Sequence, residues 1–168
     1  MLNHKESEAL DFVFNAHQNQ IDKQGKPYVL HVLRVAFSVF EHSTENVFIA
    51  ALLHDTVEDC GVNLTEVEVR FGHRVALAVD SLTRRPKETY TDYIQRVKQD
   101  AVAVKVKLAD LADNMDESRM SQLDEETQKR LRKRYAKAVE SLTFDRIGRG
   151  PESLARRHPN TGRSSTGS

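Results

Sequence analysis

The segment Ala51-Leu52-Leu53-His54-Asp55-Thr56-Val57-Glu58-Asp59 decides the fold, because an apolar helical run ends there in a cluster of polar and charged side chains. It predicts the end of a helix over about 45–59, stopped by Gly61 in a left-handed conformation. His54 and Glu58 are four residues apart, as are Asp55 and Asp59, so each pair shares one side of that helix. Taken alone, this pattern is compatible with a solvated polar helix end and also with a cation-binding site.

The charges in this segment are poorly placed for the stability of a helix. Asp55 and Asp59 are like charges one turn apart, and the carboxylates lie toward the negative end of the helix dipole. Each conflict costs on the order of a few tenths of a kcal/mol, and a bound cation would reverse the sign of the effect. Local conflicts of this kind tend to mark functional sites.

Two further polar residues lie in apolar surroundings. His31 falls within an apolar stretch, where a lone histidine is usually a satisfied core residue. Asp110 is also surrounded by apolar residues, and a buried carboxylate must be paired or bind a metal. Asn114 lies one turn beyond Asp110. The two histidines and two aspartates, His31, His54, Asp55 and Asp110, suit a divalent metal such as Mn, Fe or Zn, with positions left open for water and a phosphate oxygen.

The remainder of the chain predicts an all-α, compact multi-helix fold. Apolar residues recur at helical spacing, and polar or glycine-containing loops separate the segments. The stretch 102–106 alternates like a strand, but its pattern continues as a helix through Ala112. From Gly148 the composition shifts to Gly, Pro, Ser, Arg and Thr, so we expect one domain over 1–147 and a flexible tail over 148–168. The expected helices are about 7–17, 29–40, 45–59, 63–71, 73–82, 90–98, 101–114 and 124–144.

Composition excludes several classes of function. The 168 residues carry 25 basic and 25 acidic side chains, which argues against a general nucleic-acid binder. Cys60 is the one cysteine, so an internal disulfide is impossible and a secreted disulfide scaffold is excluded. The N-terminus shows no signal peptide, and no apolar stretch is long enough to span a membrane. We therefore expect a cytoplasmic protein; the sequence leaves a homo-oligomer open.

The chain resembles the HD superfamily of metal-dependent phosphohydrolases in its H…HD…D pattern of His31, His54-Asp55 and Asp110. The resemblance is closest to the hydrolase domain of RelA/SpoT enzymes and to the stand-alone small alarmone hydrolases. Gly25-Lys26-Pro27-Tyr28-Val29-Leu30-His31 is similar to that family's G-x-P-Y-x-x-H, and residues 51–59 are similar to its A-L-L-H-D-x-V-E-D. The shorter matches are Phe71-Gly72, Leu82-Thr83, and Lys107-Leu108-Ala109-Asp110 with Asn114-Met115.

This resemblance implies a helical HD fold and hydrolysis of the 3′-pyrophosphate from guanosine tetra- and pentaphosphate by metal-activated water. It implies that Glu58 and Asp59 activate the water and assist the leaving group. The implied ligands of the divalent metal, usually manganese, are His31, His54, Asp55 and Asp110. The implied contacts to the nucleotide come from Lys23, Tyr28, Lys107, Asn114 and Tyr135.

One position departs from the family pattern. In the alarmone hydrolases an Arg-Lys pair precedes the G-x-P-Y segment and its arginine packs on the guanine base, whereas this chain has Asp22-Lys23. A carboxylate cannot stack on a base as a guanidinium does. A phosphatase acting on another nucleotide, such as a deoxynucleotide, an adenosine alarmone or NADPH, therefore remains an alternative. A non-catalytic nucleotide sensor is a further alternative, which the intact H…HD…D pattern disfavours.

Overall fold

A computed structural model describes residues 1–22 and 24–144 of the chain. These residues form an all-α structure, and the one β-type pairing among them is an isolated bridge between Ile21 and Pro27. The predicted all-α class is confirmed. The helices are α1 (His4–Ala16), α2 (Val29–Phe40), α3 (Glu45–Leu53), α4 (Thr56–Cys60), α5 (Leu64–Phe71), α6 (His73–Leu82), α7 (Tyr90–Val97), α8 (Ala101–Asn114), α9 (Glu117–Met120) and α10 (Glu125–Thr143).

Side-chain caps explain where several helices begin. Asn3 and Glu6 form a reciprocal capping box at the start of α1, so this helix begins earlier than the predicted residue 7. Asp100 accepts hydrogen bonds from two backbone N–H groups at the start of α8, which satisfies donors that the helix leaves unpaired. Gly61 ends α4 with φ +68°, the left-handed conformation predicted for it.

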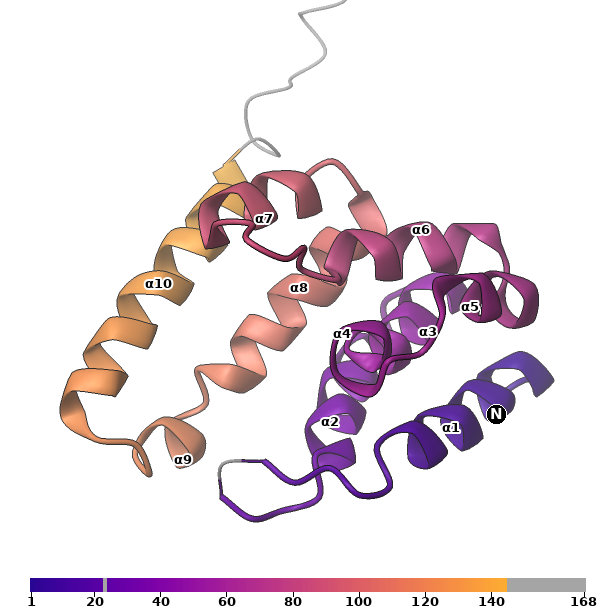
Figure 1. Cartoon of the computed structure of the whole chain (residues 1–168), viewed down its shortest axis with the longest axis horizontal. Helices are drawn as coiled ribbons and strands as arrows, with labels where there is room; N and C mark the ends of the chain where they lie inside the picture. Colours follow the sequence, from indigo (N-terminus) through magenta and orange to yellow (C-terminus); the bar gives the residue numbers. More distant parts are fainter. Residues whose placement is uncertain (23, 145–168) are drawn as a thin grey trace, which may run out of the picture.

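The core is organised around α3, whose residues from Val47 to Leu53 are all buried. This helix contacts α1, α2, α6 and α8, which surround it in Figure 1. Its apolar character on every side is what a central helix requires, because no face of it meets water. The polar residues that follow Leu53 are therefore delivered to the interior of the helical bundle.

The predicted helix over 45–59 is wrong in its continuity, because the chain turns at His54 and Asp55 between α3 and α4. Asp55 is the N-cap residue of α4, and the Thr56 hydroxyl donates to the Leu53 carbonyl oxygen at 2.8 Å. The break places His54 and Asp55 at the junction of the two helices, and the Asp59 N–H donates to the Asp55 carbonyl oxygen at 2.8 Å, which keeps this pair one turn apart. The prediction also missed the short helix α9.

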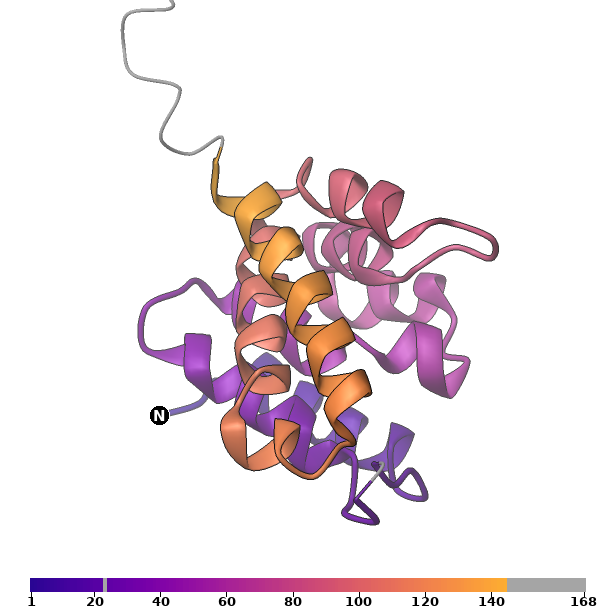
Figure 2. The same cartoon turned by 90° about the vertical axis from the view of Figure 1, so that its left-hand side faces the viewer.

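Helices α7, α8 and α10 pack together on one side of the molecule, and Figure 2 shows α10 crossing in front of α8. The loop before α7 is held by its own basic residues: the Arg84 guanidinium donates to the Glu88 carbonyl oxygen, and Arg85 pairs with Asp80 at 2.7 Å. No helix among the described residues is long and apolar enough to cross a membrane. The predicted domain end near Ile147 and the tail over 148–168 lie outside the described residues.

Candidate active site

Three buried side chains from separate parts of the chain meet at one point. His31 comes from the first turn of α2, His54 from the residue after α3, and Asp110 from α8. One ligand atom from each residue lies within 4.8 Å of the other two. The exposed fractions are 2% for His31, 3% for His54 and 5% for Asp110, so the cluster is shielded from bulk water. The structure therefore brings together three of the four predicted metal ligands.

The two histidines are oriented in the same way, by hydrogen bonds at their Nδ1 atoms. The Nδ1–H of His31 donates to Asp113 at 2.6 Å, and the Nδ1–H of His54 donates to the Ala51 carbonyl oxygen at 2.7 Å. These bonds fix the tautomer in which the lone pair of Nε2 in each ring is available to bind a metal. His54 Nε2 is buried without a hydrogen-bond partner among the described residues. A buried, unpartnered nitrogen beside carboxylates fits a metal ligand well.

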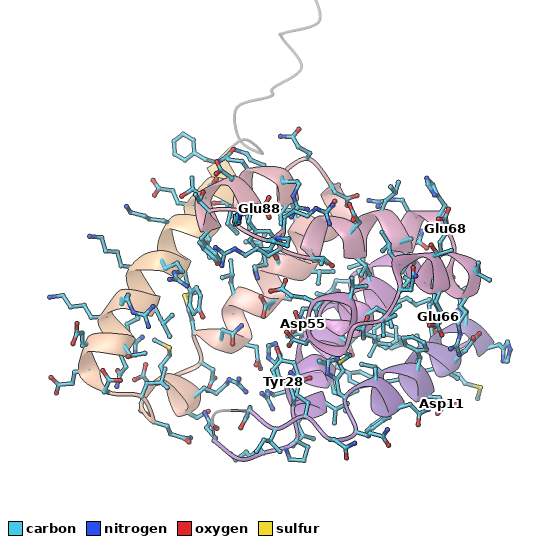
Figure 3. All side chains as sticks on the ribbon, in the orientation of Figure 1. Asp11, Tyr28, Asp55, Glu66, Glu68 and Glu88 are labelled. Carbon is cyan, nitrogen blue, oxygen red and sulfur yellow. The ribbon has the colours of Figure 1, made fainter. Side chains whose placement is uncertain are left out.

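Asp55, the fourth predicted ligand, lies beside both histidines. Its Oδ2 is 3.0 Å from His54 Nε2 and 4.0 Å from His31 Nε2, although the first contact lacks hydrogen-bond geometry. The same oxygen accepts the Tyr28 hydroxyl proton at 2.6 Å, and Figure 3 shows Tyr28 and Asp55 close to each other. Tyr28 thus holds a carboxylate oxygen against the histidine pair.

Asp110 is held by two neighbours on its own helix. Lys107 Nζ donates to Asp110 Oδ2 at 2.7 Å, and Asn114 Nδ2 donates to Oδ1 at 2.6 Å. Lys107 and Asn114 were both predicted to contact the nucleotide. In the structure both side chains donate hydrogen bonds to Asp110, so they support this carboxylate at the edge of the cluster.

The electrostatics of the cluster favour positive charge. Burial opposes ionisation of Asp110, but Lys107 and the two histidines overcome it and hold the pKa of Asp110 far below its usual value. Burial disfavours the charged imidazolium of His54, yet the adjacent Asp55 raises its pKa to about 9. Burial is likewise outweighed at Asp55, mainly by His54, and its pKa falls to about 2. Protons and metal cations compete for the same nitrogen atoms, so a site that stabilises a proton this well also suits a cation.

Asp113 is a site residue that sequence reasoning missed. Its carboxylate accepts from His31 and from Arg34 Nε, both at 2.6 Å, and Arg119 Nε lies 3.6 Å away. Burial opposes the charge, but the bonds from His31 and Arg34 lower the pKa of Asp113 to about 2. The signal in the sequence was the three-residue spacing from Asp110, which places both carboxylates toward the same side of α8.

Glu58 and Asp59, the predicted catalytic pair, are exposed residues of α4 beside the cluster. Glu58 Oε2 accepts the backbone N–H of Arg84 at 2.8 Å. Desolvation by the surrounding protein raises the pKa of Glu58, and the Arg84 bond offsets this only in part. Asp59 Oδ2 accepts from Gln20 Nε2 at 3.0 Å, and Gln20 is itself 2.5 Å from His17 Nδ1. Both carboxylates are thus positioned by residues distant in the sequence.

A cavity of about 290 Å³ opens next to the cluster, between the loop before α2 and the α8–α10 region. Its lining includes three of the residues predicted to bind the nucleotide, namely Tyr28, Asn114 and Tyr135. The fourth, Lys107, is not among its lining residues, and the fifth, Lys23, lies outside the described residues. Apolar residues make up part of the wall: Ile21, Met120, Leu123 and Leu131.

Asp22, the departure from the family pattern, closes the loop before α2. Its Oδ1 accepts the backbone N–H groups of Gln24 at 2.8 Å and Lys26 at 3.0 Å. Its Oδ2 lies 3.9 Å from Arg119 Nη1, and both residues line the cavity. Asp22 is therefore occupied in shaping the loop, and Arg119 is the arginine that the described part of the cavity presents to a ligand.

The sequence matches the model of the HD domain family over residues 9–142. A curated relative from Aquifex aeolicus, named guanosine-3′,5′-bis(diphosphate) 3′-pyrophosphohydrolase, is 36% identical over 116 residues, or 64% of this chain and 17% of that protein. The bifunctional (p)ppGpp synthase/hydrolase SpoT of Escherichia coli is 31% identical over 113 residues, or 60% of this chain and 16% of that protein. The chain thus spans less than a fifth of the length of these two relatives.

A solved structure gives a more complete match. It is described as a metazoan ortholog of SpoT that hydrolyzes ppGpp and plays a role in starvation responses. It superimposes with a TM-score of 0.73 and 27% identity, covering 85% of this chain and 88% of that one. The family model, the helical fold and the buried histidine–aspartate cluster agree, and the chain belongs to the HD domain family.

Proposed function

We propose that this chain is a metal-dependent phosphohydrolase that removes the 3′-pyrophosphate from guanosine tetra- and pentaphosphate. The observation that carries the proposal is the buried cluster of His31, His54 and Asp110, with both Nε2 atoms directed toward one point. The Aquifex relative is named as a guanosine-3′,5′-bis(diphosphate) 3′-pyrophosphohydrolase, and the solved neighbour is described as hydrolyzing ppGpp.

In this proposal His31, His54, Asp55 and Asp110 hold a divalent metal, with Mn²⁺ as the expected ion. Two imidazoles and two carboxylates are a donor set that suits Mn, Fe or Zn. When bound, such an ion supplies Lewis-acid stabilisation of the phosphate charge and a water of lowered pKa. Tyr28, Asp113, Asn114 and Lys107 act as supports, because each holds one of these side chains through a direct contact.

Glu58 and Asp59 are the proposed proton-handling groups. Glu58 has a raised pKa, which brings a carboxyl group closer to the range in which it both accepts and donates protons. Asp59 is oriented by Gln20, so its free oxygen keeps a defined direction beside the cluster. We assign activation of water to this pair, together with proton delivery to the leaving 3′-oxygen.

The nucleoside is proposed to occupy the adjacent cavity, against Tyr28, Asn114 and Tyr135. The apolar wall suits a purine ring, and the amide of Asn114 is available to a polar edge. We further propose a cytoplasmic location for the chain, because its single cysteine allows no internal disulfide of the kind that secreted proteins use. Neither the oligomeric state nor the domain boundary at Ile147 is needed for this mechanism.

The test is product release from a nucleotide panel with the manganese-loaded protein. The panel contains guanosine tetraphosphate, its adenosine analogue, NADPH and deoxynucleotides. We expect pyrophosphate from guanosine tetraphosphate, lost on chelation and restored by manganese. Turnover confined to another nucleotide would discard the alarmone assignment and keep the metal chemistry. No turnover of any nucleotide, with metal content intact, would favour a nucleotide sensor.

A further inference from the structure

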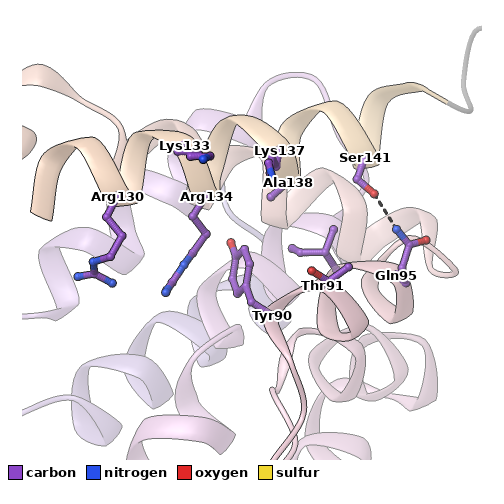
Figure 4. Close-up of a pocket in the computed structure, with 10 residues that line it drawn as sticks. Tyr90, Thr91, Gln95, Arg130, Lys133, Arg134, Lys137, Ala138 and Ser141 are labelled. Atoms are coloured by element: carbon purple, nitrogen blue, oxygen red, sulfur yellow. Dashed lines mark hydrogen bonds between the residues drawn. The ribbon is translucent and has the colours of Figure 1, made fainter. Parts of the chain in front are cut away.

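A second cavity, of about 520 Å³, lies between α7 and α10 (Figure 4). It shares no lining residue with the cavity beside the buried cluster of His31, His54 and Asp110. None of the predicted metal ligands lines it. Its volume falls within the range of small-molecule sites. The proposed hydrolysis of alarmones makes no use of this cavity.

Four cationic residues from one face of α10 line this cavity: Arg130, Lys133, Arg134 and Lys137. Arg130 and Arg134 are one turn apart, as are Lys133 and Lys137, and such like-charge pairs destabilise a helix. Across residues 1–22 and 24–144, no carboxylate forms an ion pair with any of the four. This local excess of positive charge occurs in a chain whose formal net charge is zero. An anionic ligand would supply the missing counter-charge.

The opposite wall, on α7, provides an apolar surface that could contact the uncharged part of a ligand. Ile94 of α7 is a buried apolar residue at the cavity, and the centroid of the Tyr90 ring lies 5.2 Å from the Arg134 guanidinium carbon. The Tyr90 hydroxyl is buried and has no hydrogen-bond partner among the described residues. In Figure 4 this hydroxyl is directed toward α10, between the cations. A buried hydroxyl without a partner is costly, and a ligand oxygen would satisfy it.

We propose that the α7–α10 cavity binds a nucleoside phosphate as a second ligand, separate from the nucleotide at the metal cluster. Lys133 and Lys137 neutralise the phosphates, because both ammonium groups are exposed at the rim and lack carboxylate partners. The Arg134 guanidinium lies over the Tyr90 ring and offers a plane on which a base can stack. The amide of Gln95, bonded to Ser141 at 2.9 Å, closes one end of the site.

The test is equilibrium dialysis of radiolabelled GDP against the full-length, manganese-loaded protein. The test variant is Lys133→Ala with Lys137→Ala, and the charge-matched control is Lys105→Ala with Lys129→Ala, neither of which lines a described cavity. We expect the wild type and the control to bind one more GDP per chain than the test variant. This difference is expected whether or not the metal cluster itself binds GDP, so failure of the hydrolase proposal would be seen separately.

Competition defines the ligand class. Unlabelled guanosine and inorganic pyrophosphate should each displace GDP from this site at least about tenfold less well than unlabelled GDP, because each supplies only half of the contacts. Equal GDP binding by the test variant and the wild type would overturn the proposal. An equal loss in the control would also overturn it, since the effect would then follow net charge alone. Displacement by pyrophosphate as efficient as by GDP would remove the nucleoside from the proposal.

Tyr90→Phe is an independent variant that keeps the ring. It should weaken GDP binding at this site about threefold without lowering the Tm, because the hydroxyl bonds to nothing in the described protein. Unchanged GDP affinity together with a lower Tm would show that the hydroxyl serves the fold, and this result would contradict its role in binding.

Discussion

The buried cluster of His31, His54 and Asp110 and the cavity next to it adjoin each other but are built differently. Each side chain of the cluster is held by a contact that fixes its direction, such as Asp113 on His31 or Asn114 on Asp110. The cavity instead takes its walls from the loop before α2, from the short helix α9 and from α10. The cluster keeps the whole family pattern, whereas the cavity contains the departure at Asp22. The cluster is thus fixed by contacts between its own side chains and their neighbours, whereas the cavity proposed to select the substrate depends in part on a loop.

The largest effect should come from removing both carboxylates that are proposed to handle protons. Glu58→Gln with Asp59→Asn should lower kcat by at least about 10³-fold, since each general acid or base contributes roughly 10²–10⁴-fold. Metal content, measured by elemental analysis, should stay near the wild-type value because neither residue belongs to the buried cluster. Near-normal turnover in this double variant would remove the roles assigned to the pair.

Asp113→Asn tests whether the cluster depends on the hydrogen bond that orients the His31 ring. We expect metal affinity or activity to fall by about 10–100-fold, because loss of the carboxylate weakens the orientation of His31. Asp11→Asn is the matched control, since Asp11 is an exposed aspartate on α1. Metal titration followed by activity would separate the two variants, and identical curves would show that Asp113 does not position His31.

Arg119→Ala tests whether the cavity selects the nucleotide. The cavity should lose a guanidinium contact, so KM for guanosine tetraphosphate should rise about tenfold with little change in kcat. Arg132→Ala, on the exposed side of α10, serves as the control. Because Arg119 also lies 3.6 Å from Asp113, its metal affinity should be measured in parallel. A loss of metal affinity equal to that of Asp113→Asn would show that the two regions are not separable.

These two regions also differ in how far the sequence predicted them. The four proposed ligands were predicted from the family pattern, and three of them form the buried cluster. The support that Asp113 gives to His31 could not be predicted from the sequence, because the two residues are 82 positions apart and lie on two different helices. The break at His54-Asp55 was missed because no glycine or proline marks a helix end before Gly61, whereas the turn is stabilised by a local bond from Thr56 to Leu53. Asp22 was identified as a departure, but its use in the loop emerged only from contacts to backbone N–H groups.

The smallest effect should come from removing the predicted tail. Deletion of residues 148–168 should leave kcat/KM and Tm essentially unchanged, because the composition of this segment buries little apolar surface. Activity assays and thermal melts of the full and shortened chains would check this. A large loss in either quantity would mean that the tail contributes to the domain or to an interface.

The most direct measurement is identification of the products that the manganese-loaded protein forms from guanosine tetraphosphate. Hydrolysis at the 3′-ester predicts GDP and pyrophosphate in equal amounts, and neither product in the Glu58→Gln, Asp59→Asn variant. Release of single phosphates, or no product from a protein that retains its metal, would contradict the proposed 3′-pyrophosphohydrolase.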